Sequence, residues 1–148
     1  MPVRVQQDDF DAGAEIAALR AGNLNVGAVA AFIGTVRDLN EGAGVSAMAL
    51  EHYPGMTERA LEDICAQARS RWDILDALVV HRYGDLAPGD QIVLVVVTSA
   101  HRGEAFAACE FIMDYLKTQA PFWKKERTPH GERWVDARES DDEAAARW

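Results

Sequence analysis

Positive charge and long apolar runs are both scarce in this chain of 148 residues. It has 15 Lys and Arg residues against 24 Asp and Glu residues, and its formal net charge is −9. A nucleic-acid-binding surface needs a broad basic face, so this balance argues against one. The longest apolar run, Ile92–Val97, is far shorter than the roughly 20 residues that span a membrane. Since the first residues also lack the layout of a signal peptide, a cytoplasmic location is expected.

The sequence has only two cysteines, and it lacks the motifs of several common enzyme classes. Cys65 and Cys109 have no metal-ligand spacing, and each lies in an apolar series with helical periodicity. Both thiols are therefore expected in the core, and a catalytic thiol is the less favoured alternative. His52 and His81 lie in expected strands, where a structural role is favoured over a metal-binding one. The chain also lacks a phosphate-binding loop, a dinucleotide-binding glycine motif and a nucleophile elbow, so we expect no metal and no cofactor.

Strand-like and helix-like segments alternate along the chain, without repeats or long linkers. The connections are too short for an all-parallel sheet, so the sequence predicts one α+β domain over residues 1–148 with mostly antiparallel strands. Helices are expected at 12–20, 57–72 and about 101–118, and strands at 28–36, 45–53, 74–82, 91–98 and, at an edge, 134–135.

The segments between these elements carry turn-forming residues. The glycine-rich stretch 38–44 predicts a hairpin that pairs the strands on either side of it. Thr57 is the expected N-cap of the helix that follows. Residues 83–90 are predicted to form a turn and residues 121–125 a loop, because Pro121 ends the long helix. The acidic segment 139–143 is expected to be a solvated surface or tail.

Cations are concentrated near the end of the long helix. Residues 111–127 hold four of the fifteen Lys and Arg residues, namely Lys117, Lys124, Lys125 and Arg127. Like charges placed close together destabilise a fold unless something offsets them, so an anionic ligand is the predicted reason. The alternative is a solvated helix end, where Lys interacts favourably with the helix dipole. Phe122 and Trp123 lie between the lysines and are candidates for the base of a pocket for a flat heterocycle.

A second candidate anion site lies where the strand 91–98 passes into the long helix. His101 and Arg102 stand at the start of this helix, whose free N–H groups attract anions. The alternative is that Ser99 is an N-cap and the other two are surface residues. Arg37 ends the strand 28–36 and is a weak signal when taken alone.

Five segments taken together resemble one known family, the large catalytic subunit of molybdopterin synthase (the MoaE family). The likeness extends from about Val29 to the C-terminus, and five separated motifs in the same order are far more specific than any one of them. The segments are Leu50-Glu-His-Tyr-Pro-Gly-Met56, Thr98-Ser-Ala-His-Arg102, Phe111-Ile-Met-Asp-Tyr-Leu-Lys117, Ala120-Pro-Phe-Trp-Lys-Lys-Glu126 and Arg133-Trp-Val-Asp-Ala-Arg-Glu-Ser-Asp141.

The resemblance implies an α/β hammerhead-type sandwich with two main helices. It also implies a homodimer that carries a small ubiquitin-like subunit at each end, which makes a heterotetramer. The small subunit ends in Gly-Gly and bears a C-terminal thiocarboxylate. Its sulfur goes to cyclic pyranopterin monophosphate, and two transfers build the dithiolene of molybdopterin. Neither a nucleic acid nor a membrane is an implied partner.

Functional positions of the family are matched here by suitable side chains. Lys117 and Lys124 are the implied catalytic residues, and Lys117 is the best candidate for proton transfer. Because the sulfur arrives on the partner's tail, neither cysteine is expected to be needed. The substrate-binding positions implied by the resemblance are Thr35, Val36, Arg37, His101, Arg102, Lys117, Lys124, Lys125 and Glu126.

The length of the long helix adds a constraint on any such site. Arg102 and Lys117 are 15 residues apart, which is about 22 Å along a helix. A pterin monophosphate is too short to touch both ends. A two-fold dimer that places His101 and Arg102 of one subunit beside Lys117 of the other removes the conflict. The remaining alternative function is a non-enzymatic adaptor that binds anions and holds a ubiquitin-like partner.

Overall fold

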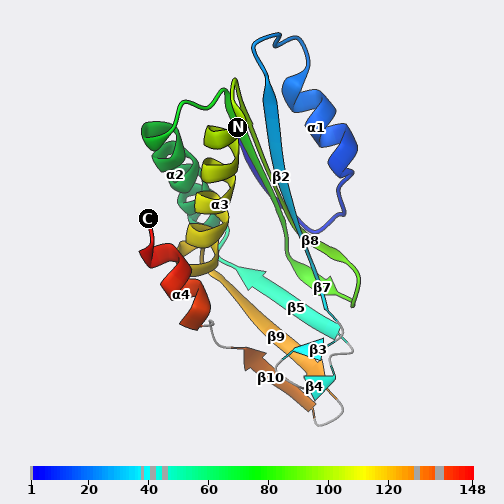
Figure 1. Cartoon of the computed structure of the whole chain (residues 1–148). Helices are drawn as coiled ribbons and strands as arrows, with labels where there is room; N and C mark the ends of the chain where they lie inside the picture. The colour runs from blue at the N-terminus through cyan, green and yellow to red at the C-terminus, as the bar shows by residue number, and fades with distance from the viewer. Residues whose placement is uncertain (1, 38, 41–42, 45–46, 129–130, 136–138) are drawn as a thin grey trace.

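The computed structural model describes residues 2–37, 39–40, 43–44, 47–128, 131–135 and 139–148. In these residues the chain forms two four-stranded sheets, one two-stranded sheet and four helices (Figure 1). The α+β sandwich with mostly antiparallel strands that the sequence predicts is confirmed. Across the described part of the chain, no helix is both long and apolar enough to cross a membrane.

The first sheet forms the centre of the molecule. Its strand order is β1 (Val3–Gln6), β6 (Asp76–Arg82), β8 (Gln91–Ser99) and β2 (Ala28–Thr35). β1 runs parallel to β6, and the other two pairs are antiparallel. The inner strands β6 and β8 are nearly continuous apolar runs because both of their faces are covered. β2 lies at the edge of the sheet.

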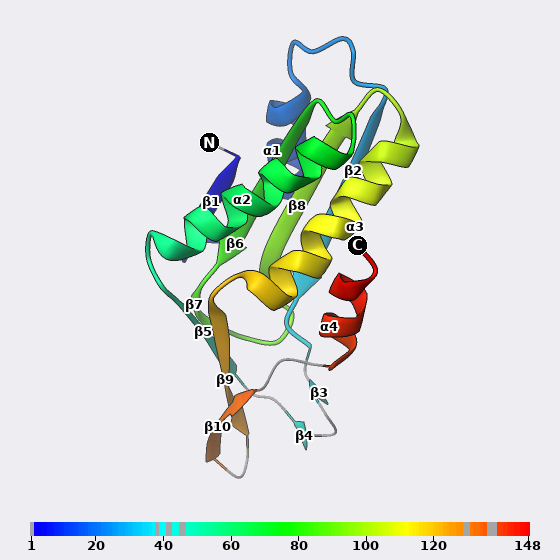
Figure 2. The same cartoon turned by 90° about the vertical axis from the view of Figure 1, so that its left-hand side faces the viewer.

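Helices cover both faces of this sheet (Figures 1 and 2). On one face α2 (Met56–Arg71) and α3 (Arg102–Gln119) pack on Ala77, Val79, Val93, Val95 and Val97. On the other face α1 (Ala12–Arg20) packs on Leu78, Val80, Leu94 and Val96. Successive residues of β6 and β8 thus face opposite layers, as strand geometry requires. A fourth helix, α4 (Glu139–Ala146), lies against α3.

The second sheet begins where α3 ends. Its strand order is β10 (Gly131–Val135), β9 (Phe122–Thr128), β5 (Ala47–His52) and β7 (Gly84–Leu86), with every pair antiparallel. Met48, Leu50 and Leu86 of this sheet are buried together with Val36, which follows β2. In both views α3 runs directly into β9, so that the sheet extends beyond the C-terminal end of the helix (Figures 1 and 2).

The predicted hairpin between the strands 28–36 and 45–53 is wrong. β2 pairs with β8 in the first sheet, whereas β5 pairs with β7 and β9 in the second. The glycine-rich stretch instead carries a very short pair, β3 (Leu39–Asn40) with β4 (Ala43–Gly44). The physical reason is that β2 finds a far longer apolar partner in β8 than in its sequence neighbour.

Three local expectations are corrected as well. Gly55, with φ of 83°, is the N-cap of α2, and Thr57 lies inside the first turn, where its hydroxyl donates to the carbonyl oxygen of Tyr53 (2.8 Å). The expected loop 121–125 is largely strand β9, and the expected turn 83–90 contains β7. The acidic segment 139–143, expected as a solvated surface or tail, lies in α4, where Asp142 and Glu143 are exposed.

Candidate active site

The cations of segment 111–127 lie where α3 meets the second sheet. Lys117 stands in the last turn of α3 and is exposed. The chain then turns through Ala120 and Pro121 into β9, which carries Lys124 and Lys125. Each lysine is thus held on a regular element that is packed against another, which limits the positions its ammonium group can reach.

Lys124 and Lys125 project to opposite faces of β9, because successive residues of a strand do so. Lys124 shares its face with Phe122 and is paired across the sheet with Leu50. Phe122 packs against the core under α3, so this is the face that turns toward Lys117. Lys125 shares its face with Trp123, whose ring lies 4.7 Å from that of Tyr53.

The same alternation separates the two aromatic residues that the sequence suggested as the base of one pocket. Phe122 lies 3.8 Å from the ring of His81, almost parallel to it, whereas Trp123 contacts Tyr53 on the other face. The two rings therefore do not form a common surface, and that expectation is wrong.

Arg37 reaches this region because Val36 anchors it. Val36 is buried with Leu50, the cross-strand partner of Lys124, in the core of the second sheet. Its N–H donates to the Asp90 carbonyl oxygen (2.9 Å), and its own carbonyl oxygen accepts from the Gly89 N–H (2.7 Å). Arg37 follows at once and is exposed. Val36 therefore contributes to the candidate site by fixing the backbone, while its side chain belongs to the core.

His81 and His52 lie beside the lysines, although sequence reasoning treated both as structural. Burial lowers the pKa of His81 to about 3, helped by the positive charges of Lys117 and Lys124 and by His52, against an opposing hydrogen bond to the Arg82 backbone. Both lysines therefore act electrostatically on one buried ring. No local signal in the sequence reveals this neighbourhood, because it depends on how β6 and β9 come together.

His101 and Arg102 lie at the other end of α3. His101 is the N-cap of the helix and Arg102 its first residue, and both are exposed. The Ser99 hydroxyl donates to the Asp73 carbonyl oxygen (2.8 Å), so this side chain ties the strand end to the preceding loop. Within one chain, the structure thus brings Arg37, Lys117 and Lys124 to the C-terminal end of α3 and leaves His101 and Arg102 at its N-terminal end. Figure 2 shows the C-terminal end of α3 next to the start of β9.

The remaining predicted residues flank the lysine end. Thr35 is the exposed last residue of β2, paired with Gln91 just after a register irregularity at Gly34. Glu126 lies on β9, where it is paired with Met48 of β5.

The two cysteines lie in the core, as expected. Cys65 is 1% exposed and Cys109 is 7% exposed. Burial raises the pKa of each thiol to about 11, so both are protonated at neutral pH and are poor nucleophiles. Among the described residues there is also no group of three or more His, Cys, Asp or Glu side chains placed to hold a metal ion.

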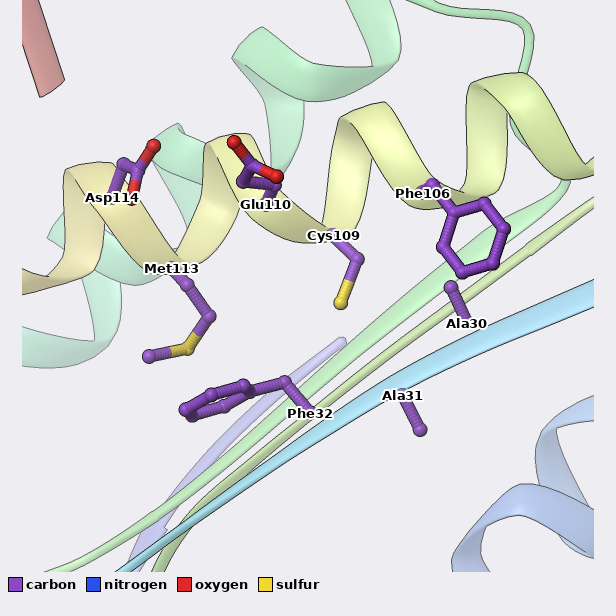
Figure 3. A pocket seen from close by; sticks show the side chains of 8 residues that line it. All are labelled: Ala30, Ala31, Phe32, Phe106, Cys109, Glu110, Met113 and Asp114. Carbon is purple, nitrogen blue, oxygen red and sulfur yellow. The ribbon is translucent and has the colours of Figure 1, made fainter. Parts of the chain in front are cut away.

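An open hollow of about 460 Å³ lies between α3 and the edge strand β2 (Figure 3). Phe106, Cys109 and Met113 project from α3 toward the strand, and Phe32 projects from β2 near Met113. The hollow is largely apolar, with Glu110 and Asp114 at its margin, and contains none of the predicted site residues. Its character suits contact with another protein surface better than binding of a phosphorylated small molecule.

Comparisons with known proteins show the family and the fold of the chain. A family model described as "MoaE protein" matches residues 5–119. The molybdopterin synthase catalytic subunit of Ralstonia nicotianae is 70% identical over 146 residues, which cover 99% of this chain and 83% of that protein. A solved structure of the molybdopterin biosynthesis MoaE protein from Burkholderia ambifaria is 65% identical, with a TM-score of 0.85 and coverage of 99% of this chain and 96% of that one.

A more distant solved structure shares the fold. It is the complex of subunits 1 and 2 of the molybdopterin-converting factor from Helicobacter pylori, which is 21% identical, with a TM-score of 0.76. The match covers 93% of this chain and 92% of that one.

Proposed function

Because the chain belongs to the MoaE protein family, we propose that it is the catalytic subunit of a molybdopterin synthase. It transfers sulfur from the C-terminal thiocarboxylate of a small ubiquitin-like subunit to cyclic pyranopterin monophosphate, and two transfers form the dithiolene. The observation that carries the proposal is the 70% identity to a molybdopterin synthase catalytic subunit over 99% of this chain. We further propose that residues 1–148 act as one domain and, from the bacterial relatives, that the protein works in the cytoplasm.

The cations at the lysine end of α3 suit both reactants. The pterin carries a phosphate and the small subunit's tail carries a thiocarboxylate, so Arg37, Lys117 and Lys124 meet two anions. Hydrogen bonds between such ionised groups are about twice as strong as neutral ones. Thr35 and Glu126 are neighbours that complete the binding set, and Lys125 supplies further positive charge from the other face of β9.

Lys117 is the residue we assign to proton transfer during sulfur addition. The sulfur forms a bond to a pterin carbon that loses an oxygen substituent, and water replaces the sulfur on the carbonyl carbon of the tail, which is left as an ordinary carboxylate. The protons exchanged in these steps need a nearby donor and acceptor. Lys117 sits in the last turn of α3 and Lys124 on a paired strand, and the positive charges of both help to lower the pKa of the same buried ring, His81. The protonated, buried thiols of Cys65 and Cys109 favour transfer straight from the partner's tail over a persulfide on this chain.

We propose that the protein is a homodimer formed along β2. This edge strand exposes apolar side chains on both of its faces: Phe32 is 40% exposed on the α3 side, and Val29 and Ile33 are 37% and 43% exposed on the other. Phe106, beside the hollow, is 65% exposed. An uncovered apolar edge strand promotes association with another chain, so a second copy is its natural cover.

A two-fold dimer along β2 would also complete the site. The Ala28 end of β2 pairs with Ser99, close to His101, and the Thr35 end pairs with Gln91, close to Arg37. The eight residues of β2 span about 24 Å, close to the 22 Å between the two ends of α3. A partner lying antiparallel along this edge would bring its own His101 and Arg102 to the Arg37 and Lys117 end, twice per dimer.

The partner subunit is a small ubiquitin-like protein, and two copies on the homodimer make a heterotetramer. The distant complex from Helicobacter pylori, in which a chain of this fold is bound to a second subunit, supports this part of the proposal.

Incubation of the protein with a thiocarboxylated small subunit and cyclic pyranopterin monophosphate tests the proposed function. We expect dithiolene product, detected by mass spectrometry or by oxidation to a fluorescent pterin. Controls contain a small subunit with an ordinary carboxylate, which has no sulfur to give. Tight binding of the small subunit without any product would instead support the non-enzymatic adaptor.

A further inference from the structure

His81 is a buried polar residue for which the proposed chemistry has no use. It lies near the end of β6, is 4% exposed and faces the layer that holds α2 and α3, as Val79 does. Its ring stacks on Phe122 with 3.8 Å between centroids and 18° between planes. Since β6 belongs to the first sheet and Phe122 opens β9 of the second, this stack joins the two sheets at their junction.

The hydrogen bond of His81 defines its tautomer. Nδ1 lies 2.8 Å from the carbonyl oxygen of Arg82, which can only accept, so Nδ1 carries the proton. In a neutral ring Nε2 then holds a lone pair. Burial, together with the charges of Lys117 and Lys124, lowers the pKa of His81 to about 3, so the ring is neutral at neutral pH.

A second contact holds Phe122 from the side of β5. His52, paired with Phe122 across the sheet, has its ring 5.9 Å from the Phe122 ring and 4.5 Å from that of Tyr83. His52 Nδ1 lies 3.1 Å from the hydroxyl of Thr57. That hydroxyl donates to the Tyr53 carbonyl oxygen, so it accepts from His52 and ties this ring to the start of α2.

We propose that His81 is a positioning residue for the reaction: by stacking on Phe122 it sets the place of Lys124 relative to Lys117. Lys124 is two residues after Phe122 on the same face of β9, a step of about 7 Å along the strand. Lys117 reaches the same neighbourhood from α3. The proposal rests on the sulfur-transfer function proposed above, and it names a residue that would never touch substrate.

A histidine suits this position better than an aliphatic or a charged residue. A flat ring is needed to stack on Phe122, and a donor is needed for the Arg82 carbonyl at the end of β6. A positively charged side chain would place a third cation beside Lys117 and Lys124, and its repulsion would push the lysines apart. The neutral Nδ1–H tautomer supplies both requirements without adding charge.

The test compares His81→Leu with Val80→Ala. Val80 is the adjacent residue of β6 and is fully buried, but it faces α1 on the opposite side of the sheet from His81, which makes it a matched control for loss of stability. We expect His81→Leu to lower kcat about 10- to 100-fold, because a misplacement of about 1 Å has effects of that size. The affinity for the small subunit should stay unchanged, and Val80→Ala should keep kcat within about threefold of the wild type.

Two further variants separate positioning from general damage. His81→Phe retains a ring for the stack and should restore kcat to within about fivefold of the wild type, although it gives up the Arg82 hydrogen bond. Phe122→Leu should lower kcat as His81→Leu does. The double variant should be no worse than either single one, because both remove the same contact. The proposal would be overturned if the double variant lost the product of the two single-variant decreases in kcat. It would also be overturned if Val80→Ala, at the same stability, lost as much kcat as His81→Leu.

A spectroscopic readout keeps the test independent of turnover. In protein labelled with ¹³C-lysine, the Lys124 side-chain signal should shift in His81→Leu and Phe122→Leu, return in His81→Phe and stay in place in Val80→Ala. If the wild type made no dithiolene, the proposed function would fail, while these shifts would still decide whether His81 positions Lys124. If the chemical shift of the Lys124 side chain is the same in His81→Leu as in the wild type, the inference is wrong, even if the enzyme is active.

Discussion

The two ends of α3 both carry cations, but they are built differently. At the N-terminal end, His101 and Arg102 are exposed and rest on the strand-to-helix turn. At the C-terminal end, Lys117 stands beside a second sheet, the His81–Phe122 stack and the buried cluster around Val36. One end is thus a simple surface and the other an organised junction. The difference suggests that the junction does the chemistry and the simple end completes the site of a partner subunit.

Replacement of Lys117 should have the largest effect on turnover. We expect Lys117→Ala to reduce product formation by about a thousandfold or more, since a proton-transfer group and a cation are lost together. Lys124→Ala should be impaired less, through weaker binding or positioning. The matched control is Arg20→Ala, which removes an exposed cation from the last turn of α1. Wild-type turnover in a folded Lys117→Ala dimer would remove this residue from the mechanism.

Mixed dimers test whether the two ends of α3 serve one site. Arg102→Ala and Lys117→Ala proteins should each be inactive or nearly so when assayed alone. After subunit exchange, half of the dimers are mixed and each has one intact site, so about a quarter of wild-type activity should return. Native mass spectrometry of the mixture checks that mixed dimers have formed. If they form and remain inactive, the shared site is wrong.

Acid should weaken the fold through the junction. The pKa of His81 is lowered from its ordinary value of 6.5 to about 3, so below pH 6.5 the unfolded chain binds a proton that the folded chain refuses. The free energy of unfolding should therefore fall by about 2 kcal/mol between pH 7 and pH 5 from this residue alone.

Urea unfolding at the two pH values measures that loss. His81→Phe should show a smaller decrease than the wild type, because the titrating group has gone. In Val80→Ala, the free energy of unfolding should fall between pH 7 and pH 5 by as much as in the wild type, although this variant is less stable at both pH values. Equal pH dependence in wild type and His81→Phe would contradict the assignment.

The smallest effect on activity is expected from replacing the two cysteines, since neither lies at the N-terminal or the C-terminal end of α3. A Cys65→Ala, Cys109→Ala double variant should be less stable by about 1–3 kcal/mol because each change leaves a small void. It should still transfer sulfur from a thiocarboxylated small subunit at a rate within about threefold of the wild type. Thermal unfolding verifies that the variant is folded. Loss of all activity in that folded protein would restore a persulfide mechanism to consideration.

Elements with a strong local pattern were predicted well from the sequence. The long helix was expected at about 101–118 and is found at Arg102–Gln119, and the apolar strand expected at 91–98 is found at Gln91–Ser99. Which strands pair with one another could not be predicted in the same way. β9 contains Lys124, Lys125 and two further charged residues, so it has no apolar alternation, and its strand conformation comes from hydrogen bonding to β5 and β10.

The sequence by itself determined the family, the helix that separates two cationic groups by about 22 Å, and the gathering of lysines after that helix. These follow from residue identity and local periodicity, which do not depend on distant parts of the chain. Only the tertiary structure decided that Lys124, and not Lys125, shares a face with Phe122, that Val36 anchors Arg37, and that the buried His81 feels the charges of both Lys117 and Lys124. The reason is that strand partners and facing layers are chosen among segments far apart in sequence, and each side chain's neighbours exist only after that choice is made.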